Sequence, residues 1–276
     1  MNLIQGNCLE KMKDISDNSI DLLFCDLPYG QTSCKWDSII DLELFWKEVN
    51  RICKIDCPMF FTCSTKFGVS LINSNPKNFR YDLVWVKSAP CGFLNAKKMP
   101  MKRHEMIYVF YRKLPMYNIS SHKHKFLRER KEEWCDKNGL YGEDISVPKT
   151  EYKYDPPLPN SVIRNTSNYK NDSETYGNVP RPDFMRKNGE SAYDPPLPNS
   201  LLEIKSEKRK HPTQKPTDLI KWCLKYYSNE GDTILDPTMG SGSTGVACKE
   251  MNRNFIGIEK DEKIFNVAVE RINEIN

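Results

Sequence analysis

Residues 20–29 have the sequence Ile-Asp-Leu-Leu-Phe-Cys-Asp-Leu-Pro-Tyr, and this stretch decides the fold that we expect. Its first six residues are mostly large and apolar and are followed at once by Asp26, Pro28 and Gly30, which predicts a buried strand with an abrupt end. Open α/β sheets bind their ligands at the carboxyl ends of such strands. The stretch therefore predicts a ligand site after Cys25. A turn that only ends the strand is the alternative.

The four residues Asp26-Leu27-Pro28-Tyr29 suit a planar base that carries an exocyclic amine. The lone pair of such an amine is delocalised into the ring, so the nitrogen is a poor nucleophile. If Asp26 and the carbonyl of Leu27 each accept one N–H, the nitrogen is drawn towards tetrahedral geometry. Tyr29 is expected to stack on the extruded base, as aromatic residues do in enzymes that flip bases.

A second strand end lies far downstream, where Thr233-Ile234-Leu235 leads into the sequence Asp-Pro-Thr-Met-Gly-Ser-Gly-Ser-Thr-Gly at 236–245. The glycines of this turn have the spacing of a dinucleotide fingerprint, in which missing side chains let the backbone approach a cofactor. A further short strand at 254–259 ends in Glu259, at the separation expected of a carboxylate that binds ribose hydroxyls. The alternative is that Glu259 is an exposed acid that caps the helix starting near Asp261.

These two halves resemble the DNA amino-methyltransferases that use S-adenosylmethionine. The catalytic motif precedes the cofactor motif, as in the β class of that family. The resemblance extends to four further stretches and covers roughly two thirds of the chain. They are Gly6–Glu10, Tyr81–Lys87, His104–Phe110 and His211–Pro216.

The resemblance implies a role for twelve residues. The catalytic motif is Asp26, Leu27, Pro28 and Tyr29, and the cofactor-binding residues are Asn7, Cys8, Lys215, Asp236, Thr238, Gly240, Gly242 and Glu259. Lys215 is expected to face the methionine carboxylate. Two positions depart from the family pattern: Thr238 stands where an aromatic residue is usual, and Asn7 where Asp is usual. Both departures bear on cofactor affinity more than on the type of reaction.

The implied reaction moves the methyl group of S-adenosylmethionine to the N6 amine of a flipped adenine in double-stranded DNA. Transfer is a direct displacement that needs no covalent enzyme intermediate. Relatives that methylate the N4 amine of cytosine more often begin their motif with Ser, so Asp26 favours adenine. A nicotinamide-dependent oxidoreductase and a DNA-binding relative that has lost catalysis are the alternatives from other classes.

Alternating strands and helices predict an α/β fold: a doubly wound, mostly parallel, Rossmann-like methyltransferase sheet, circularly permuted. Besides those at 233–235 and 254–259, we expect strands near 2–5, 20–25, 57–62, 80–87 and 104–112, and helices near 41–53, 64–73, 216–228, 242–252 and 261–274. Residues 1–112 and 206–276 would form the catalytic domain. Residues 113–205 would be an inserted target-recognition segment.

The expected insertion differs in texture from the rest of the chain. Proline, asparagine, serine and tyrosine are frequent there, and the segment Tyr154–Ser161 recurs as Tyr193–Ser200. We expect the repeat to shape a loop, because no apolar strand precedes either copy. Basic residues with interleaved aromatics at 111–134, and a basic cluster at 205–210, could contact DNA phosphates or form a solvated face.

Composition limits the remaining classes. A chain of 276 residues with 38% hydrophobic residues can bury one sizeable core, and the net charge of +4 is modest. No stretch approaches the roughly 20 apolar residues of a membrane span and no secretion signal is present, so we expect an intracellular protein. The resemblance implies a bacterial or phage-encoded protein that acts in the cytoplasm. The ten cysteines contain no Cys-x-x-Cys pair and only four histidines are present, so we expect reduced thiols and no metal. Relatives of the β class often pair as homodimers.

Overall fold

The computed structural model describes residues 1–30, 39–91, 98, 102–118, 120, 123–124, 154–155, 202–204 and 214–275. The chain divides into two units, Met1–Tyr117 with Ser161–Asn276, and Asn118–Asn160. In the second unit β6 (Lys123–His124) pairs antiparallel with β7 (Tyr154–Asp155). Most of the expected insertion at 113–205, with its repeat and its basic residues from 125 onward, lies outside the described residues. The proposed domain boundaries therefore stay a prediction.

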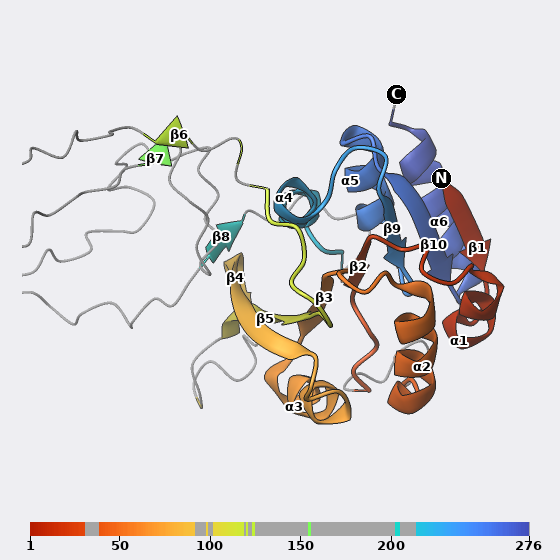
Figure 1. Ribbon diagram of the computed structural model, residues 1–276, viewed down its shortest axis with the longest axis horizontal. Helices are drawn as coiled ribbons and strands as arrows, with labels where there is room; N and C mark the ends of the chain where they lie inside the picture. Colours follow the sequence, from red (N-terminus) through yellow and green to blue (C-terminus); the bar gives the residue numbers. More distant parts are fainter. Residues whose placement is uncertain are drawn as a thin grey trace, which may run out of the picture. The chain divides into compact units, whose positions relative to one another are not determined.

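The first unit is built around one sheet (Figure 1). Its strands are β1 (Asn2–Gln5), β2 (Leu22–Cys25), β3 (Met59–Cys63), β4 (Phe79–Cys91), β5 (Lys102–Phe110), β8 (Leu202–Ile204), β9 (Thr233–Asp236) and β10 (Asn254–Glu259). Its helices are α1 (Cys8–Lys11), the short 3-10 helix η1 (Met12–Asp14), α2 (Leu42–Ile52), α3 (Thr65–Ser74), α4 (Thr217–Tyr227), α5 (Ser243–Glu250) and α6 (Glu262–Asn273). The elements expected from the sequence are present: β1 and β10 have the expected bounds, and the others have shifted ends. The elements α1, η1 and β8 were not expected.

The strand order of the sheet is β1-β10-β9-β2-β3-β5-β4-β8. The strands from β1 to β3 in that order are all parallel, and β5 runs antiparallel to both β3 and β4. Leu22 and Leu23 of β2 pair with Ile234 and Leu235 of β9, so the first and last thirds of the chain meet at the centre of the sheet (Figure 1). This order confirms the doubly wound, permuted fold. Parallel pairing also brings the carboxyl ends of β2 and β9 to one edge.

Helix starts follow local capping chemistry. Asp41 Oδ1 accepts from the amides of Glu43 (2.9 Å) and Leu44 (3.0 Å) at the start of α2. The same arrangement at Asp261 begins α6. Each carboxylate satisfies amides that have no partner inside the helix and interacts favourably with the positive end of its dipole. These caps explain why the predicted starts of both helices agree with the structure.

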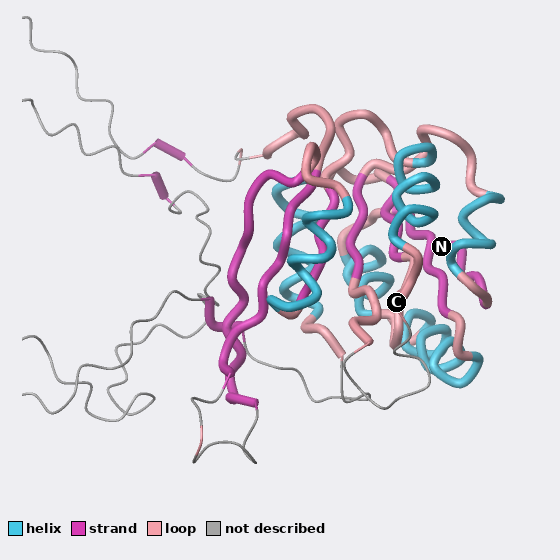
Figure 2. Tube along the Cα trace, turned by 90° about the horizontal axis from the view of Figure 1, so that it is seen from below, coloured by secondary structure: helices cyan, strands magenta, loops and turns pink. Residues whose placement is uncertain are grey.

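Strand β2 is buried on both faces of the sheet. Leu22 and Phe24 pack with residues of α4, α5 and α6 on one face, including Leu219 and Val246. Leu23 and Cys25 pack with α2 and α3 on the other face, which Figure 2 shows covered by its own helices. Successive side chains of a strand point to opposite faces, so burial on both sides requires a continuous apolar run.

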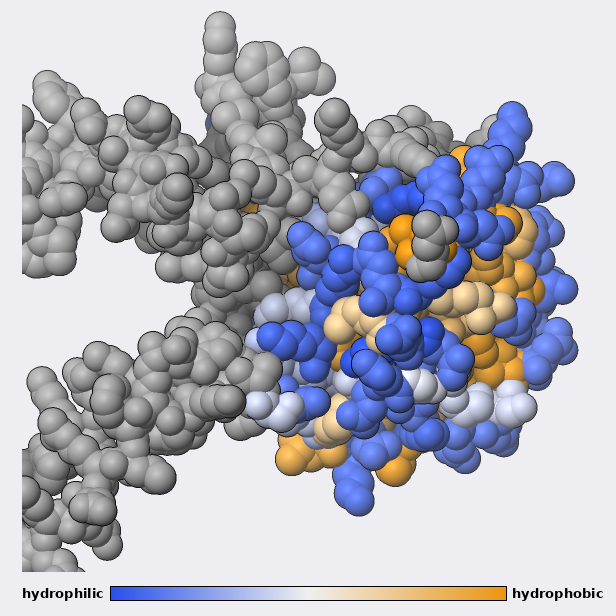
Figure 3. All heavy atoms as spheres, turned by 90° about the horizontal axis from the view of Figure 1, so that it is seen from above, coloured by the Kyte–Doolittle hydropathy of each residue, from blue (hydrophilic) through white to orange (hydrophobic). Residues whose placement is uncertain are grey.

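Seven of the described cysteines belong to this core. These seven, Cys8, Cys25, Cys53, Cys57, Cys63, Cys223 and Cys248, are buried and free, which confirms for these residues the expectation of reduced thiols. Hydrophilic residues dominate the described surface seen in Figure 3, with hydrophobic residues interspersed among them. None of the helices within the described ranges is long and apolar enough to cross a membrane.

Candidate active site

The expected catalytic motif and the glycine turn meet at the edge where β2 and β9 end. Asp26 follows β2 directly, and Asp236 is the last residue of β9. Thr238, in the turn after β9, donates its hydroxyl to the main-chain carbonyl of Asp26 at 3.0 Å, across 212 residues of sequence. Cys25 Sγ lies 3.3 Å from the same hydroxyl oxygen. One threonine therefore joins the two strand ends.

The carboxylate of Asp26 is surrounded by side-chain donors. Its Oδ1 accepts from the hydroxyls of Tyr29 (2.6 Å) and Thr62 (2.5 Å), and its Oδ2 accepts from Lys215 Nζ (2.5 Å). The Asp26 side chain is 29% exposed, so solvent still reaches it. These donors come from the turn after β2, from β3 and from the residue pair before α4, and together they fix the orientation of the Asp26 carboxylate at the strand end.

Tyr29 is held by both ends of its side chain. Its ring lies 5.4 Å from that of Phe67, tilted by 35°, and its hydroxyl is also 2.9 Å from the carbonyl of Thr62. Burial, together with the adjacent Asp26 carboxylate, raises the pKa of Tyr29 well above its ordinary value. The phenol therefore stays protonated and remains a donor to Asp26. Of the other two motif residues, Leu27 is buried and Pro28 is half-buried.

Lys215 lies between two acids. Its side chain is 12% exposed, and Nζ is 2.5 Å from Asp26 and 3.8 Å from Glu105 Oε2. Burial alone would lower the pKa of Lys215, but the charges of Asp26 and Glu105 outweigh burial and raise that pKa. The lysine is thus a charged ammonium that contacts the expected catalytic acid. Its expected role towards the methionine carboxylate stays a prediction.

The glycine turn has one open side and one packed side. Gly240 and Gly242 adopt positive φ angles of 53° and 81°. A Cβ added to Gly242 would lie 3.0 Å from Ala268 Cβ of α6, whereas one added to Gly240 would meet nothing within 4 Å. Gly242 therefore allows close helix packing, and Gly240 leaves space beside the turn.

Glu259 closes the other side of this turn. It is half-buried, and its two oxygens accept from the amides of Gly240 (3.0 Å) and Asp261 (2.8 Å). Burial raises the pKa of Glu259, although these two amides act in the opposite direction. The cap of α6 is Asp261 and Glu259 is not exposed, so the alternative interpretation of Glu259 as an exposed cap is wrong.

Asp236 is almost fully buried, at 4% exposure. Its carboxylate accepts from the hydroxyl of Thr244 (2.5 Å) and the amide of Thr238 (3.1 Å). Burial raises the pKa of Asp236 to about 7, against the influence of these two donors. Asp236 therefore stabilises the glycine turn through its hydrogen bonds with Thr238 and Thr244.

Asn7 and Cys8 lie beside the same edge, after β1. The side chain of Asn7 caps α1 by accepting from the amide of Leu9 at 3.0 Å, and the neighbouring Gly6 amide donates to the Glu259 carbonyl at 2.9 Å. Cys8 is buried, which raises its pKa to about 11 and keeps it a thiol. The residues of the two motifs that we expected are thus gathered at one edge of the sheet, and what each binds stays a prediction.

Sequence reasoning missed three residues that shape the site: Thr62, Phe67 and Glu105. Thr62 is the single polar residue in the buried strand Met-Phe-Phe-Thr-Cys of β3, which was an available signal. Glu105 follows the basic residues at 102–104 that begin β5, so the sequence did not single it out. The partner of each could not be read, because it depends on the strand order.

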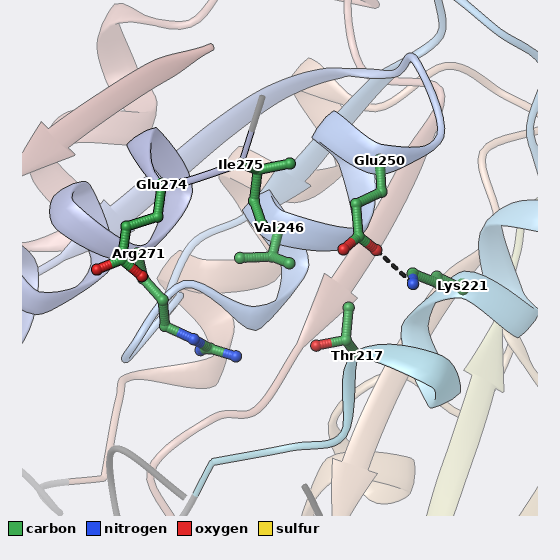
Figure 4. A pocket seen from close by; sticks show the side chains of 7 residues that line it. All are labelled: Thr217, Lys221, Val246, Glu250, Arg271, Glu274 and Ile275. Carbon is green, nitrogen blue, oxygen red and sulfur yellow. Dashed lines mark ion pairs between the residues drawn. The ribbon is translucent and has the colours of Figure 1, made fainter. Parts of the chain in front are cut away.

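A cavity of about 290 Å³ lies on the helix side of the glycine turn (Figure 4). Its lining includes Lys221 of α4, which pairs with Glu250 of α5, and Arg271 of α6. Arg271 donates to the carbonyl of Ser241 at 2.8 Å and so supports the turn from behind. Asp26, Tyr29 and Glu259 do not line this cavity, so it is separate from the candidate site. Within the described residues, no group of three or more His, Cys, Asp or Glu side chains could hold a metal ion.

Comparison with known proteins agrees with this architecture. The family model described as DNA methylase matches residues 20–270. The Type II methyltransferase M.HinfI of Haemophilus influenzae is 26% identical, over 99% of this chain and 68% of its own length. The DNA adenine methyltransferase YhdJ of Escherichia coli K12 is 27% identical, over 98% of this chain and 82% of its own length. The crystal structure of the M1.HpyAVI–SAM complex has the same fold, with a TM-score of 0.58 and 22% identity over 99% of this chain and 98% of that one.

Proposed function

This chain belongs to the DNA methylase family, and from that membership we propose that it methylates the exocyclic N6 amine of adenine in double-stranded DNA, with S-adenosylmethionine as the methyl donor. The methylase relatives support the class of reaction. The choice of adenine depends on the resemblance, since relatives that methylate cytosine more often have Ser at the position of Asp26. The bacterial methylase relatives support work in the cytoplasm of a bacterium or in a phage-infected cell, and the homodimer stays a prediction.

One observation carries the proposal. The hydroxyl of Thr238 and the parallel pairing of β2 with β9 put the acid after β2 and the glycine turn after β9 at the same sheet edge. A methyl transferase has to hold the methyl donor and the acceptor side by side, because orientation of the two reactants supplies much of the acceleration. The two motifs meet this requirement.

The glycine turn fits a cofactor of the S-adenosylmethionine type. The open space beside Gly240 allows an extended ligand to approach the backbone, and Glu259 stands next to it at the end of β10. Each oxygen of the Glu259 carboxylate accepts one hydrogen bond from a main-chain amide. Each oxygen therefore keeps a lone pair that could accept from a ribose hydroxyl. When bound, the cofactor supplies an electrophilic methyl group on a positively charged sulfur.

Asp26 and Tyr29 then prepare the base. The carboxylate accepts an N–H of the amine and so directs the nitrogen lone pair at the methyl carbon, while Tyr29 offers its ring face to a flipped base. The bond from sulfur to methyl would break as the bond from nitrogen to methyl forms, and the amine would lose one proton to the Asp26 carboxylate that accepts its N–H. Phe67 and the hydroxyl contacts of Tyr29 fix the ring, so stacking costs little additional ordering.

Methylation of the N4 amine of cytosine is the nearest alternative, since the matching family joins N6 and N4 methylases. Cytosine presents the same kind of amine to Asp26, so the chemistry at the acid does not separate the two bases. A DNA-binding relative without catalysis is the alternative from another class, and it would follow from loss of cofactor binding through Thr238.

Incubation with methyl-labelled S-adenosylmethionine and unmethylated genomic DNA tests the proposal. Mass spectrometry of the digested DNA should detect N6-methyladenine. N4-methylcytosine in its place would replace the proposed base and keep the enzyme class. Absence of label from DNA would support the inactive relative, and a titration in which S-adenosylmethionine does not bind would trace the lost catalysis to the cofactor site.

A further inference from the structure

Four charged side chains form a row through the candidate site. Lys87 of β4 pairs with Glu105 of β5, Glu105 lies 3.8 Å from Lys215, and Lys215 lies 2.5 Å from Asp26. The exposed fractions of these side chains are only 14%, 17%, 12% and 29% in that order. The row alternates in sign and its formal charges sum to zero. It is therefore a shielded cluster in which each charge depends on its neighbours.

One atom in this row has no hydrogen bond. Glu105 Oε2 is buried and makes none, although Lys215 Nζ is close by. A buried carboxylate oxygen without a donor is costly and needs an explanation. The Lys215 ammonium lies 3.8 Å from this oxygen, and its hydrogen bond is directed at Asp26 instead.

In contrast to Glu105 Oε2, both oxygens of Asp26 already accept hydrogen bonds. Its Oδ1 already accepts from Tyr29 and Thr62, and its Oδ2 is occupied by Lys215. The proposed function, on which this inference rests, requires Asp26 to accept an N–H from the target base. Of these three donors only Lys215 approaches Oδ2, so a base N–H that approaches this oxygen competes with the ammonium for it. An ammonium displaced from Asp26 needs a new acceptor, and Glu105 Oε2 at 3.8 Å is one that the protein itself supplies, in addition to the methionine carboxylate expected of the cofactor.

We propose that Glu105 is a positioning residue that receives Lys215 when Asp26 takes the amine of the base. A movement of about 1 Å brings Nζ from its present 3.8 Å to an ordinary charge-assisted hydrogen bond with Glu105 Oε2. No proton changes place, and the cluster keeps its neutrality. The exchange satisfies the buried oxygen of Glu105 and frees Oδ2 of Asp26 in one step. Lys87 holds Glu105 in place throughout.

The variant Glu105→Gln tests the proposal, measured as single-turnover methyl transfer to DNA. The amide is a weaker acceptor for the ammonium, so Lys215 should stay on Asp26 and the rate should fall about tenfold, the factor that about 1.4 kcal/mol supplies. The same substitution in a Lys215→Met background should cause no further loss, because there is then no ammonium to move. A role limited to packing would produce the same loss in both backgrounds and would overturn the proposal, as would a wild-type rate in Glu105→Gln.

Controls separate folding and the proposed function from this inference. Glu250→Gln removes a carboxylate from another ion pair, with Lys221, outside the candidate site, and its rate should stay within about twofold of wild type. Should Glu105→Gln fail to fold, Glu105→Asp keeps the charge, withdraws the oxygen and should show the same loss. If the wild type itself transfers no methyl group, the proposed function fails, and the inference with it. If the wild type transfers methyl groups and Glu105→Gln does so at the same rate, the inference is refuted and the proposed function stands.

A crystal structure of the ternary complex with DNA and a non-reactive cofactor analogue gives a second readout. Lys215 Nζ should lie about 2.8 Å from Glu105 Oε2, with Asp26 on the amine of the base. Lys215 still bonded to Asp26, with the base amine held elsewhere, would contradict the exchange.

Discussion

The acid after β2 and the acids around the glycine turn lie at one sheet edge but are held in different ways. Asp26 is bound by three side chains, those of Tyr29, Thr62 and Lys215. Asp236 and Glu259 are held largely by main-chain amides and by one neighbouring hydroxyl. Side chains can rotate away from a partner, whereas amides of a packed turn cannot. The comparison suggests that the β2 end is built to exchange partners and the glycine turn to keep its shape.

The largest expected effect comes from removing the exchangeable acid. Asp26→Ala should lower the rate of methyl transfer by about a thousandfold, the size expected when a group acting only in the transition state is lost. Binding of S-adenosylmethionine, measured by titration calorimetry, should change far less, because the glycine turn does not depend on the Asp26 carboxylate. Asp26→Asn is the matched variant, since it keeps the size and one acceptor of the side chain. A rate near wild type in both variants would remove Asp26 from the mechanism.

Two alanine substitutions in the turn should separate its open side from its packed side. Both put a side chain at a positive φ, which costs about 1–2 kcal/mol of stability. Gly240→Ala fills the open space and should raise the dissociation constant for S-adenosylmethionine by about tenfold or more. Gly242→Ala additionally presses on Ala268 and should show the larger fall in melting temperature. Equal effects of the two variants on affinity and on melting would mean that the sides do not differ.

The link between the two regions should have a smaller effect. Thr238→Val removes the hydroxyl and leaves the main-chain carbonyl of Asp26 without this donor, so transfer should slow by about tenfold. Thr238→Ser keeps the hydroxyl and should recover most of the rate. The comparison is made at saturating cofactor, so that a change in affinity does not enter. Equal losses in Thr238→Val and Thr238→Ser would indicate that the methyl group, and not the hydrogen bond, matters.

The smallest expected effect is a pH dependence of stability from Asp236. Burial raises the pKa of this carboxyl to about 7 in the folded protein, so between the ordinary Asp pKa near 4 and pH 7 the folded state binds more protons than the unfolded state. The contribution of Asp236 to the free energy of unfolding therefore falls as pH rises through that window and is level above it. Urea unfolding at pH 5 and pH 8 should show a smaller pH difference for Asp236→Asn than for wild type. An unchanged difference would mean that the group titrates normally.

Much of the fold could be predicted because short stretches of sequence determine where its strands and helices lie. The double burial of Leu22 to Cys25 required a continuous apolar run, and Asp41 and Asp261 mark helix starts by their own hydrogen bonds. The short helix α1 was missed because it is only four residues long and depends on the Asn7 cap. The strand β8 was missed because its pairing with β4 comes from a distant segment.

The candidate site could be predicted only in part. The catalytic motif and the glycine turn are both recognisable from their residue types, and the carboxyl ends of parallel strands meet at one edge of a sheet. The proximity of the two motifs could therefore be predicted. The partners of Asp26 were not, since Thr62 reaches it only because β3 lies beside β2, and Glu105 approaches Lys215 from β5. The contact of Lys215 with Asp26 was also unforeseen, because the resemblance directed that lysine at the cofactor.

The most direct test of the account is a crystal structure of the protein with S-adenosylmethionine. We predict that the cofactor lies in the open space beside Gly240, with its ribose on Glu259 and its methyl group facing the Asp26 carboxylate and the ring of Tyr29. A cofactor bound away from the glycine turn, or one whose methyl group points away from Asp26, would contradict the account.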